Sequence, residues 1–206
     1  MIRTARYIFL CALAAGIPLQ ASFLYSNCST NCTGFDSGAA LQWSGDTEVW
    51  AMQFTLASSG FLSDVQLALA DGGSTSDNYA IKIAADASGN PGTVLDSMPL
   101  TGVPNAPGSV EANSVSNPFL TAGTTYWFEV TALSPGASTS WYVADQPVSG
   151  GAETLSSDGG STWNAPNFTS TQSAFELDGG VPEPAAWTFT IGGLLALAAW
   201  RRRRAS

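Results

Sequence analysis

Apolar side chains recur at every second position in short segments of this sequence, and clusters of turn-forming residues separate those segments. In one segment the alternating apolar residues are Trp50, Met52, Phe54 and Leu56. A two-residue period is the geometry of a β-strand with one buried face, because successive side chains point to opposite sides. No segment before Pro184 has the 3.6-residue period of a long amphipathic helix.

We predict strands in six segments that alternate in this way or are rich in β-branched and aromatic residues. They are residues 49–57, 61–70, 79–85, 125–133, 140–144 and 174–177. Turn-forming clusters lie at residues 71–74, 88–92, 104–108, 134–136 and 149–151. Short strands with frequent turns predict an all-β fold, a single β-sandwich or jelly-roll domain over residues 23–180.

The N-terminus has the layout of a secretory signal, which we place at residues 1–22. Arg3 and Arg6 provide its positive region, and residues 7–17 provide its apolar region. The alternative is an uncleaved N-terminal anchor, but this apolar run is short for a membrane-spanning helix.

The C-terminus, residues 181–206, has three parts in a fixed order. Val181, Pro182, Glu183 and Pro184 are followed by sixteen residues without a charge, 185–200, and then by Arg201, Arg202, Arg203 and Arg204. Sixteen helical residues rise about 24 Å, near the lower limit for a single transmembrane helix. The arginines should stay in the cytoplasm by the positive-inside bias, so the domain is expected outside the inner membrane.

This tail resembles the PEP-CTERM sorting signal of Gram-negative bacteria, in which a Pro-Glu-Pro motif, an apolar helix and an arginine cluster follow one another. The resemblance covers residues 181–204 and implies recognition by an exosortase, a membrane-embedded cysteine transpeptidase-like enzyme. It also implies cleavage near the motif and transfer to the cell surface or extracellular matrix. The alternative is an ordinary anchor preceded by a proline-rich stalk.

Charge is distributed very unevenly along the chain. The formal net charge is −9, but residues 22–180 contain Lys82 as their single cation against fifteen carboxylates, a net charge of −14. Nucleic-acid binding is therefore excluded, since it needs clustered lysine and arginine. The chain also contains no histidine, which removes the commonest general base and metal ligand.

Four fragments of the domain together are similar to the choice-of-anchor β-sandwich domains, most closely to their R type. They are residues 90–95, residues 120–127, Trp141 and residues 158–163. The resemblance covers residues 49–177, and it implies export and display rather than catalysis.

Two cysteines, Cys28 and Cys32, remain once the signal is removed. We predict a disulfide between them in the oxidising periplasm. Free thiols or a role in sorting are the alternatives.

Ser156, Asp158, Gly160, Thr162 and Trp163 fit the Asp-box pattern of sialidases and other β-proteins. In those proteins the box is a structural hairpin turn, and the same role is expected here. A sialidase activity is excluded because the exported domain has no arginine to hold a substrate carboxylate.

Calcium is the one cofactor that the sequence suggests. Asp71 and Asp77 bound an acidic loop with oxygen donors of the kind that Ca²⁺ prefers, and residues 86–90 are similar. Solvated turns are the alternative, and otherwise we expect no cofactor.

Two further residue sets point to carbohydrate. A sugar-stacking platform would use Trp43, Trp50, Trp127, Trp141 and Trp163, although strand alternation favours the core for most of them. A glycosidase would use a pair from Glu111, Glu129 and Glu153. We favour a non-enzymatic surface or matrix protein associated with exopolysaccharide or biofilm, with a carbohydrate-binding module as the alternative and a secreted hydrolase as the third hypothesis.

Overall fold

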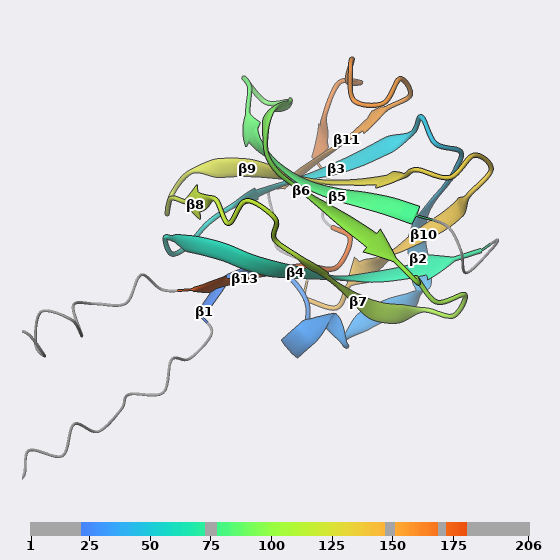
Figure 1. Ribbon diagram of the computed structural model, residues 1–206, viewed down its shortest axis with the longest axis horizontal. Helices are drawn as coiled ribbons and strands as arrows, with labels where there is room; N and C mark the ends of the chain where they lie inside the picture. Colours follow the sequence, from blue (N-terminus) through green and yellow to red (C-terminus); the bar gives the residue numbers. More distant parts are fainter. Residues whose placement is uncertain (1–21, 73–77, 147–150, 169–171, 181–206) are drawn as a thin grey trace, which may run out of the picture.

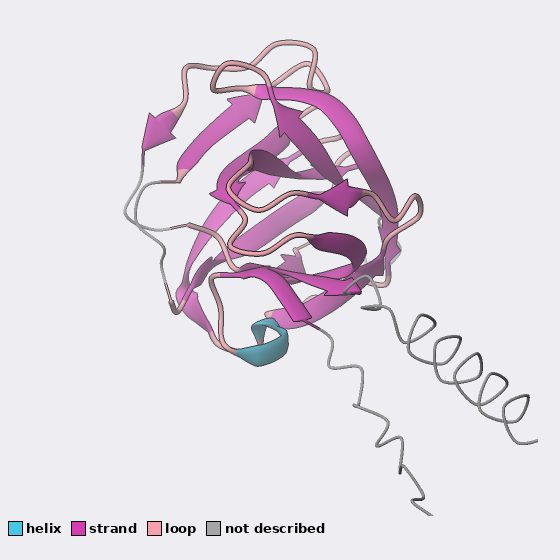
Figure 2. Cartoon of the chain, turned by 90° about the vertical axis from the view of Figure 1, so that its left-hand side faces the viewer, coloured by secondary structure: helices cyan, strands magenta, loops and turns pink. Residues whose placement is uncertain are grey.

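The alternating segments form antiparallel strands that pair into two sheets, one stacked on the other (Figure 1). The computed structural model describes residues 22–72, 78–146, 151–168 and 172–180. Within these residues the one helical element is a short 3-10 turn, η1 (Thr30–Cys32), which lies at the side of the first sheet (Figure 2). The predicted all-β fold is confirmed.

The first sheet has the spatial order β1 (Ser22–Ser26), β13 (Phe175–Gly180), β4 (Gly60–Asp71), β10 (Ser138–Ala144) and β2 (Phe35–Ser44), with β7 (Gly108–Asn113) and β8 (Phe119–Leu120) also paired to β4. The second sheet has the order β12 (Asn167–Phe168), β11 (Ala152–Ser156), β3 (Val49–Thr55), β9 (Thr125–Ala132), β5 (Asn78–Asp86) and β6 (Pro91–Thr101). Since β1 pairs with β13, the first and last described strands are neighbours.

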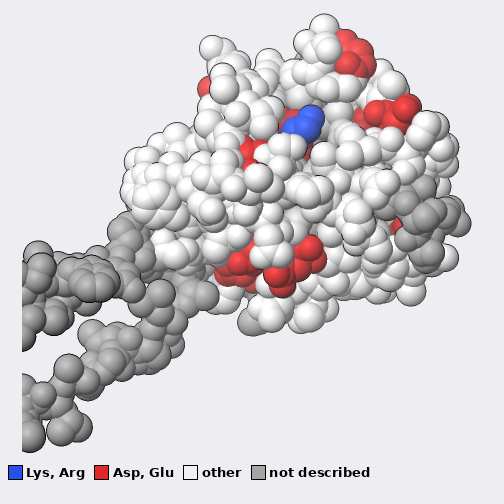
Figure 3. Space-filling model, in the orientation of Figure 1, with Lys and Arg blue, Asp and Glu red and all other residues white. Residues whose placement is uncertain are grey.

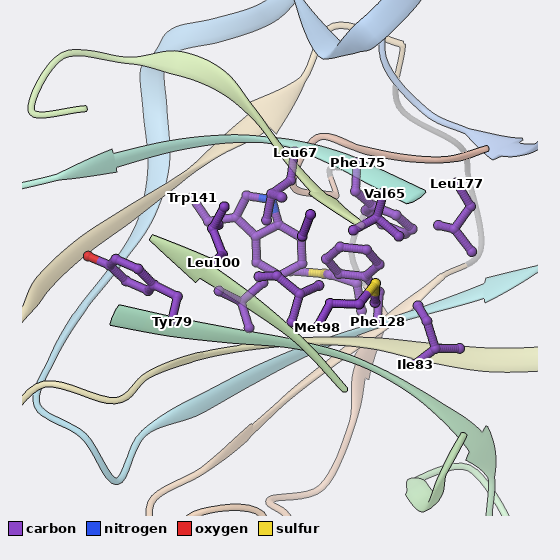
Figure 4. Close-up of a cluster of buried hydrophobic side chains, with 14 of the residues drawn as sticks. Val65, Leu67, Tyr79, Ile83, Met98, Leu100, Phe128, Trp141, Phe175 and Leu177 are labelled. Carbon is purple, nitrogen blue, oxygen red and sulfur yellow. The ribbon is translucent and has the colours of Figure 1, made fainter. Parts of the chain in front are cut away.

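The main hydrophobic core lies between the two sheets and combines aliphatic side chains with a group of packed aromatic rings (Figure 4). Phe175 of the first sheet stacks on Phe128 of the second, with ring centroids 4.5 Å apart. Trp141 and Tyr25 pack against the same Phe175 ring at 6.1 and 5.0 Å. The Phe175–Phe128 contact joins the two sheets across the core, and Trp141 and Tyr25 pack against it from the first sheet.

The predicted apolar faces are the faces that the core buries. Met52, Phe54 and Leu56 are buried, and so are the alternating residues Val65, Leu67 and Leu69 of β4 and Tyr79, Ile81 and Ile83 of β5. Trp50 is only partly buried and packs at the margin of the core.

The outer face of the second sheet carries a smaller buried cluster that the sequence pattern did not predict. Ala51, Ala84, Trp127 and Ala152 form it, and Trp163 packs against it from the loop after β11. Trp127 is therefore fully buried, although it points away from Phe128 and the main core.

Two predicted turns are shorter than expected. β4 continues through Asp71, and β6 already begins at Pro91. β6 lies at the edge of its sheet, where a strand tolerates prolines because one side of its backbone needs no hydrogen-bond donors.

No helix within the described residues is long and apolar enough to cross a membrane. Residues 1–21 of the predicted signal, 1–22, lie outside the described residues, and so does the predicted transmembrane helix. Ser22 is the first residue of β1.

Candidate functional site

Carboxylates gather on the outer face of the first sheet, where β13, β4 and β7 run side by side (Figure 3). In one row Asp178 lies opposite Asp64, and in the next row Glu176 and Glu111 flank Gln66. Directly opposite residues of antiparallel strands share a face, with Cβ atoms about 4.5–5.5 Å apart. The register therefore brings these four side chains together on one face, and we call them the carboxylate cluster.

Asp178 is a buried member of the carboxylate cluster that faces another acid directly. Its side chain is 7% exposed, and its Oδ1 atom is buried without a hydrogen-bond partner. Burial raises the pKa of Asp178 to about 7, assisted by the charges of Asp64 and Glu176 and by the hydrogen bond with Asp64. Asp178 is therefore half-protonated near neutral pH.

The disulfide-bonded loop covers one side of the carboxylate cluster. Cys28 and Cys32 are joined by the predicted disulfide, with Cα atoms 5.0 Å apart. The backbone N–H of Asn31 donates to Glu176 Oε1 at 3.2 Å, while the hydroxyl of Ser109 donates to the Asn31 carbonyl at 2.6 Å. Glu176 is buried beneath this loop, and desolvation raises its pKa.

No three His, Cys, Asp or Glu side chains of the described residues are arranged to hold one metal ion. The carboxylate cluster was not predicted from the sequence, since its members come from three strands. The one hint in the sequence is that these acids alternate with apolar residues: Asp64 stands next to Val65, and Glu176 and Asp178 stand on either side of Leu177.

The Asp-box residues form one tight turn after β11. Asp158 Oδ1 accepts hydrogen bonds from Ser156 Oγ and the Thr162 backbone N–H, both at 2.8 Å, and Asp158 Oδ2 accepts from Thr162 Oγ1 at 2.7 Å. These bonds, led by that from the Thr162 hydroxyl, lower the pKa of Asp158 to about 2. Gly160 has a φ of +91°, a backbone conformation that glycine adopts without strain.

This turn positions Trp163 rather than a reactive group. The Ser156 hydroxyl also accepts from the Gly160 N–H at 2.8 Å, and the Gly159 N–H donates to the Thr47 carbonyl at 2.8 Å. The turn is thereby fixed against the β2–β3 connection, and Trp163 covers the outer cluster of the second sheet. Its geometry is that of a structural lid over the sheet.

Asp71, one of the two candidate calcium ligands, is fully buried at the end of β4 and does not lie in a solvated turn. Its backbone N–H donates to the Pro104 carbonyl at 2.8 Å. Asp77 lies outside the described residues. The second candidate calcium loop, residues 86–90, is held by hydrogen bonds within the protein. Asp86 Oδ1 accepts from the Trp127 indole at 2.8 Å, and Asp86 Oδ2 accepts from the Gly89 N–H at 3.1 Å.

The tryptophans considered as a sugar-stacking platform are distributed over different parts of the fold. Trp127 and Trp141 are fully buried and point to different hydrophobic clusters, so neither ring is available to stack on a sugar. Trp50 and Trp163 are partly buried against those two clusters. The structure does not describe the side chain of Trp43.

The three glutamates considered as glycosidase carboxylates do not meet. Glu111 lies on β7 of the first sheet, whereas Glu129 and Glu153 lie on the second. Glu129 is opposite Ala51 and Glu153 is opposite Met52, consecutive residues of β3, so their side chains point to opposite faces. Glu129 is 3% exposed and pairs with Lys82 at 3.9 Å.

The sorting motif, Val181 to Pro184, and the arginine cluster, Arg201 to Arg204, lie outside the described residues. The last described strand, β13, ends at Gly180, the residue before the motif. No model of a known protein family matches the chain, and no curated protein matches it.

Proposed function

We propose that this chain is a non-enzymatic exported protein that an exosortase sorts to the cell surface or extracellular matrix, where it associates with exopolysaccharide or biofilm. The observation that carries the proposal is the tripartite tail: a Pro-Glu-Pro motif, sixteen uncharged residues and four arginines, in that order. In the sequence this tail begins at Val181, directly after the end of β13, the last described strand.

The arrangement of the domain ends is compatible with two processed termini. Ser22 lies opposite Gly179 in the β1–β13 pair, so the described residues begin and end at one place. Both proposed cleavages therefore lie at the same end of the sandwich, at or beyond the outer ends of β1 and β13, the first and last strands that the structure describes. The domain that remains is acidic and contains an intramolecular disulfide, both typical of exported proteins.

A hydrolase has less support from the described residues. The glycosidase candidates are separated, and the one facing acid pair, Asp64 and Asp178, is in hydrogen-bond contact. Glycosidases need their carboxyl groups about 5–9.5 Å apart to admit the sugar or a water molecule. Sugar binding without catalysis remains the second proposal, but it requires residues other than Trp127 and Trp141.

Localisation of tail variants in the native host tests the proposal. We expect a protein that ends at Gly180 to be released from the membrane without passing through the exosortase step. The double substitution Pro182→Ala and Pro184→Ala should leave the full-length chain in the inner membrane. Pro107→Ala, which changes an exposed turn proline, is the matched control and should be sorted normally. Unchanged localisation of both tail variants would refute the proposal.

A further inference from the structure

Three phenylalanines are exposed at one end of the outer face of the first sheet. Phe23, Phe61 and Phe119 are 50%, 45% and 49% exposed. Phe61 lies opposite Phe119 in the β4–β8 pair, and their rings make an edge contact with centroids 5.1 Å apart. We call these three residues the phenylalanine patch.

Strand register places Phe23 on the same face as the other two rings. Phe23 lies opposite Asp178 on β13, which lies opposite Asp64 on β4. Leu62 is buried in the core, so its neighbour Phe61 points outward, on the side of Asp64. Asp178 and Asp64 follow Phe23 in the same row; Asp178 is only 7% exposed, and Asp64 is half-buried.

The chain leaves the domain beside this patch. Gly180, the last described residue, lies directly opposite Phe61. The uncharged run begins five residues later, at Ala185. Five extended residues span at most about 18 Å, so a membrane that holds residues 185–200 lies within reach of the patch.

We propose that the phenylalanine patch docks on the lipid headgroup region of the membrane that holds the C-terminal segment, which keeps residues 181–184 at the membrane surface. The inference rests on the proposed function, because it requires the tail to insert. Aromatic side chains bury favourably at the boundary between headgroups and acyl chains. The short tether raises the local concentration of the membrane, so a patch of modest affinity stays bound.

Charge decides which part of the face touches the lipid. The carboxylate cluster begins beside Phe23, at Asp178 and Asp64, and continues along the same sheet away from the patch. Its exposed member Glu111 lies on β7. Anionic lipids repel these carboxylates, so the sheet does not lie flat on the membrane. The phenylalanine end makes the contact, and residues 181–184 are presented at the depth where a membrane-embedded enzyme acts.

Spin labels on the full chain in phosphatidylcholine liposomes test the docking. One label replaces Ala122, an exposed residue beyond β8, and a control label replaces Leu133, which is 51% exposed beyond β9 at the opposite end of the sandwich. Cys11→Ser leaves the introduced thiol as the reactive one, because Cys28 and Cys32 are disulfide-bonded. Collisions with oxygen and with a water-soluble nickel chelate then report the depth of each label.

We expect the oxygen-to-nickel ratio to be severalfold higher at position 122 than at position 133. Serine at all three positions of the phenylalanine patch should reduce the ratio at 122 to that at 133. Adding phosphatidylglycerol to the liposomes should lower the ratio at position 122 partly, because the anionic lipid repels the carboxylates. The same high ratio without liposomes would overturn the proposal, since the chain's own segment or a second copy would then cover the patch.

A third label, in place of Leu194 within the uncharged run, separates this inference from the proposed function. If the label at 194 is in lipid while the label at 122 is water-exposed, the docking is wrong and the anchor stands. If the label at 194 is itself water-exposed, the docking and the membrane-inserted tail are both wrong.

Discussion

Asp178 of β13 and Asp64 of β4 lie directly opposite each other on the outer face of the first sheet, and their side chains are hydrogen-bonded. Two carboxylates in such contact repel each other unless one holds a proton. Burial of Asp178, together with the charges of Asp64, Glu176 and Glu111, favours the protonated form of Asp178 in the folded protein. The pair links the stability of the domain to pH.

Asp178 should make the protein less stable as pH rises from about 4 to above 7. The folded state raises the pKa of Asp178 from 3.8 to about 7, so over this range the folded chain binds more protons than the unfolded chain. Each pKa unit corresponds to about 1.4 kcal/mol, and partial access of water to the cluster reduces the total to roughly 1–2 kcal/mol. Asp178→Asn should remove this loss and be the more stable protein at pH 8.

Urea denaturation at pH 4, 6 and 8 measures the effect. The exposed carboxylate Asp46 provides the matched control as Asp46→Asn. If the free energy of unfolding changed with pH in the same way for the wild type and Asp178→Asn, the raised pKa of Asp178 would be contradicted.

Phe175→Ala should cost about 3–5 kcal/mol of unfolding free energy, as is usual for removal of a large buried ring. Phe175 is fully buried and contacts Tyr25, Phe54, Phe128 and Trp141. Phe23→Ala, at a half-exposed position, should change the free energy by no more than about 0.5 kcal/mol. Equal effects in chemical denaturation would mean that the core is not centred on Phe175.

Loss of the Cys28–Cys32 disulfide should destabilise the domain by about 2 kcal/mol, the chain-entropy value for a loop this short. Alanine at both positions avoids placing hydroxyl groups in these buried sites. Dithiothreitol should lower the stability of the wild type by a similar amount and leave the double-alanine variant unchanged. Sensitivity of the variant to the reductant would show that something other than this bond is responsible.

Asp158→Ala should lower the melting temperature by loosening the Asp-box turn, because three hydrogen bonds to its carboxylate are lost. The exposed neighbour Ser157 gives the matched control, Ser157→Ala, which should melt as the wild type does. Thermal unfolding followed by circular dichroism makes the comparison. An unchanged melting temperature for Asp158→Ala would mean that the turn does not contribute to the fold.

Strands with clear two-residue alternation could be predicted from the sequence because their pattern is local. β3, β4 and β5 bury the faces that the pattern assigned to them. β2 was missed because Gly38, Ala39 and Ala40 interrupt its alternation, and β6 was missed because Pro91 and Pro99 usually mark the end of a strand. The edge position that tolerates these prolines is a property of the completed sheet.

The candidate site could be predicted only where its contacts are close in sequence. The Asp-box turn and the disulfide join residues four positions apart or fewer. The carboxylate cluster depends on the register of β13, β4 and β7, which no local pattern determines. The burial of Trp127 likewise depends on the later loop that brings Trp163 over its face.

Intact mass of the native protein, measured after fractionation of its own host, tests the central claim most directly. The proposal predicts a surface or medium fraction whose mass lacks both the first twenty-odd residues and everything beyond the motif that ends at Pro184. A chain in the inner membrane that still contains Arg201 to Arg204 would contradict exosortase sorting and make the tail a plain anchor.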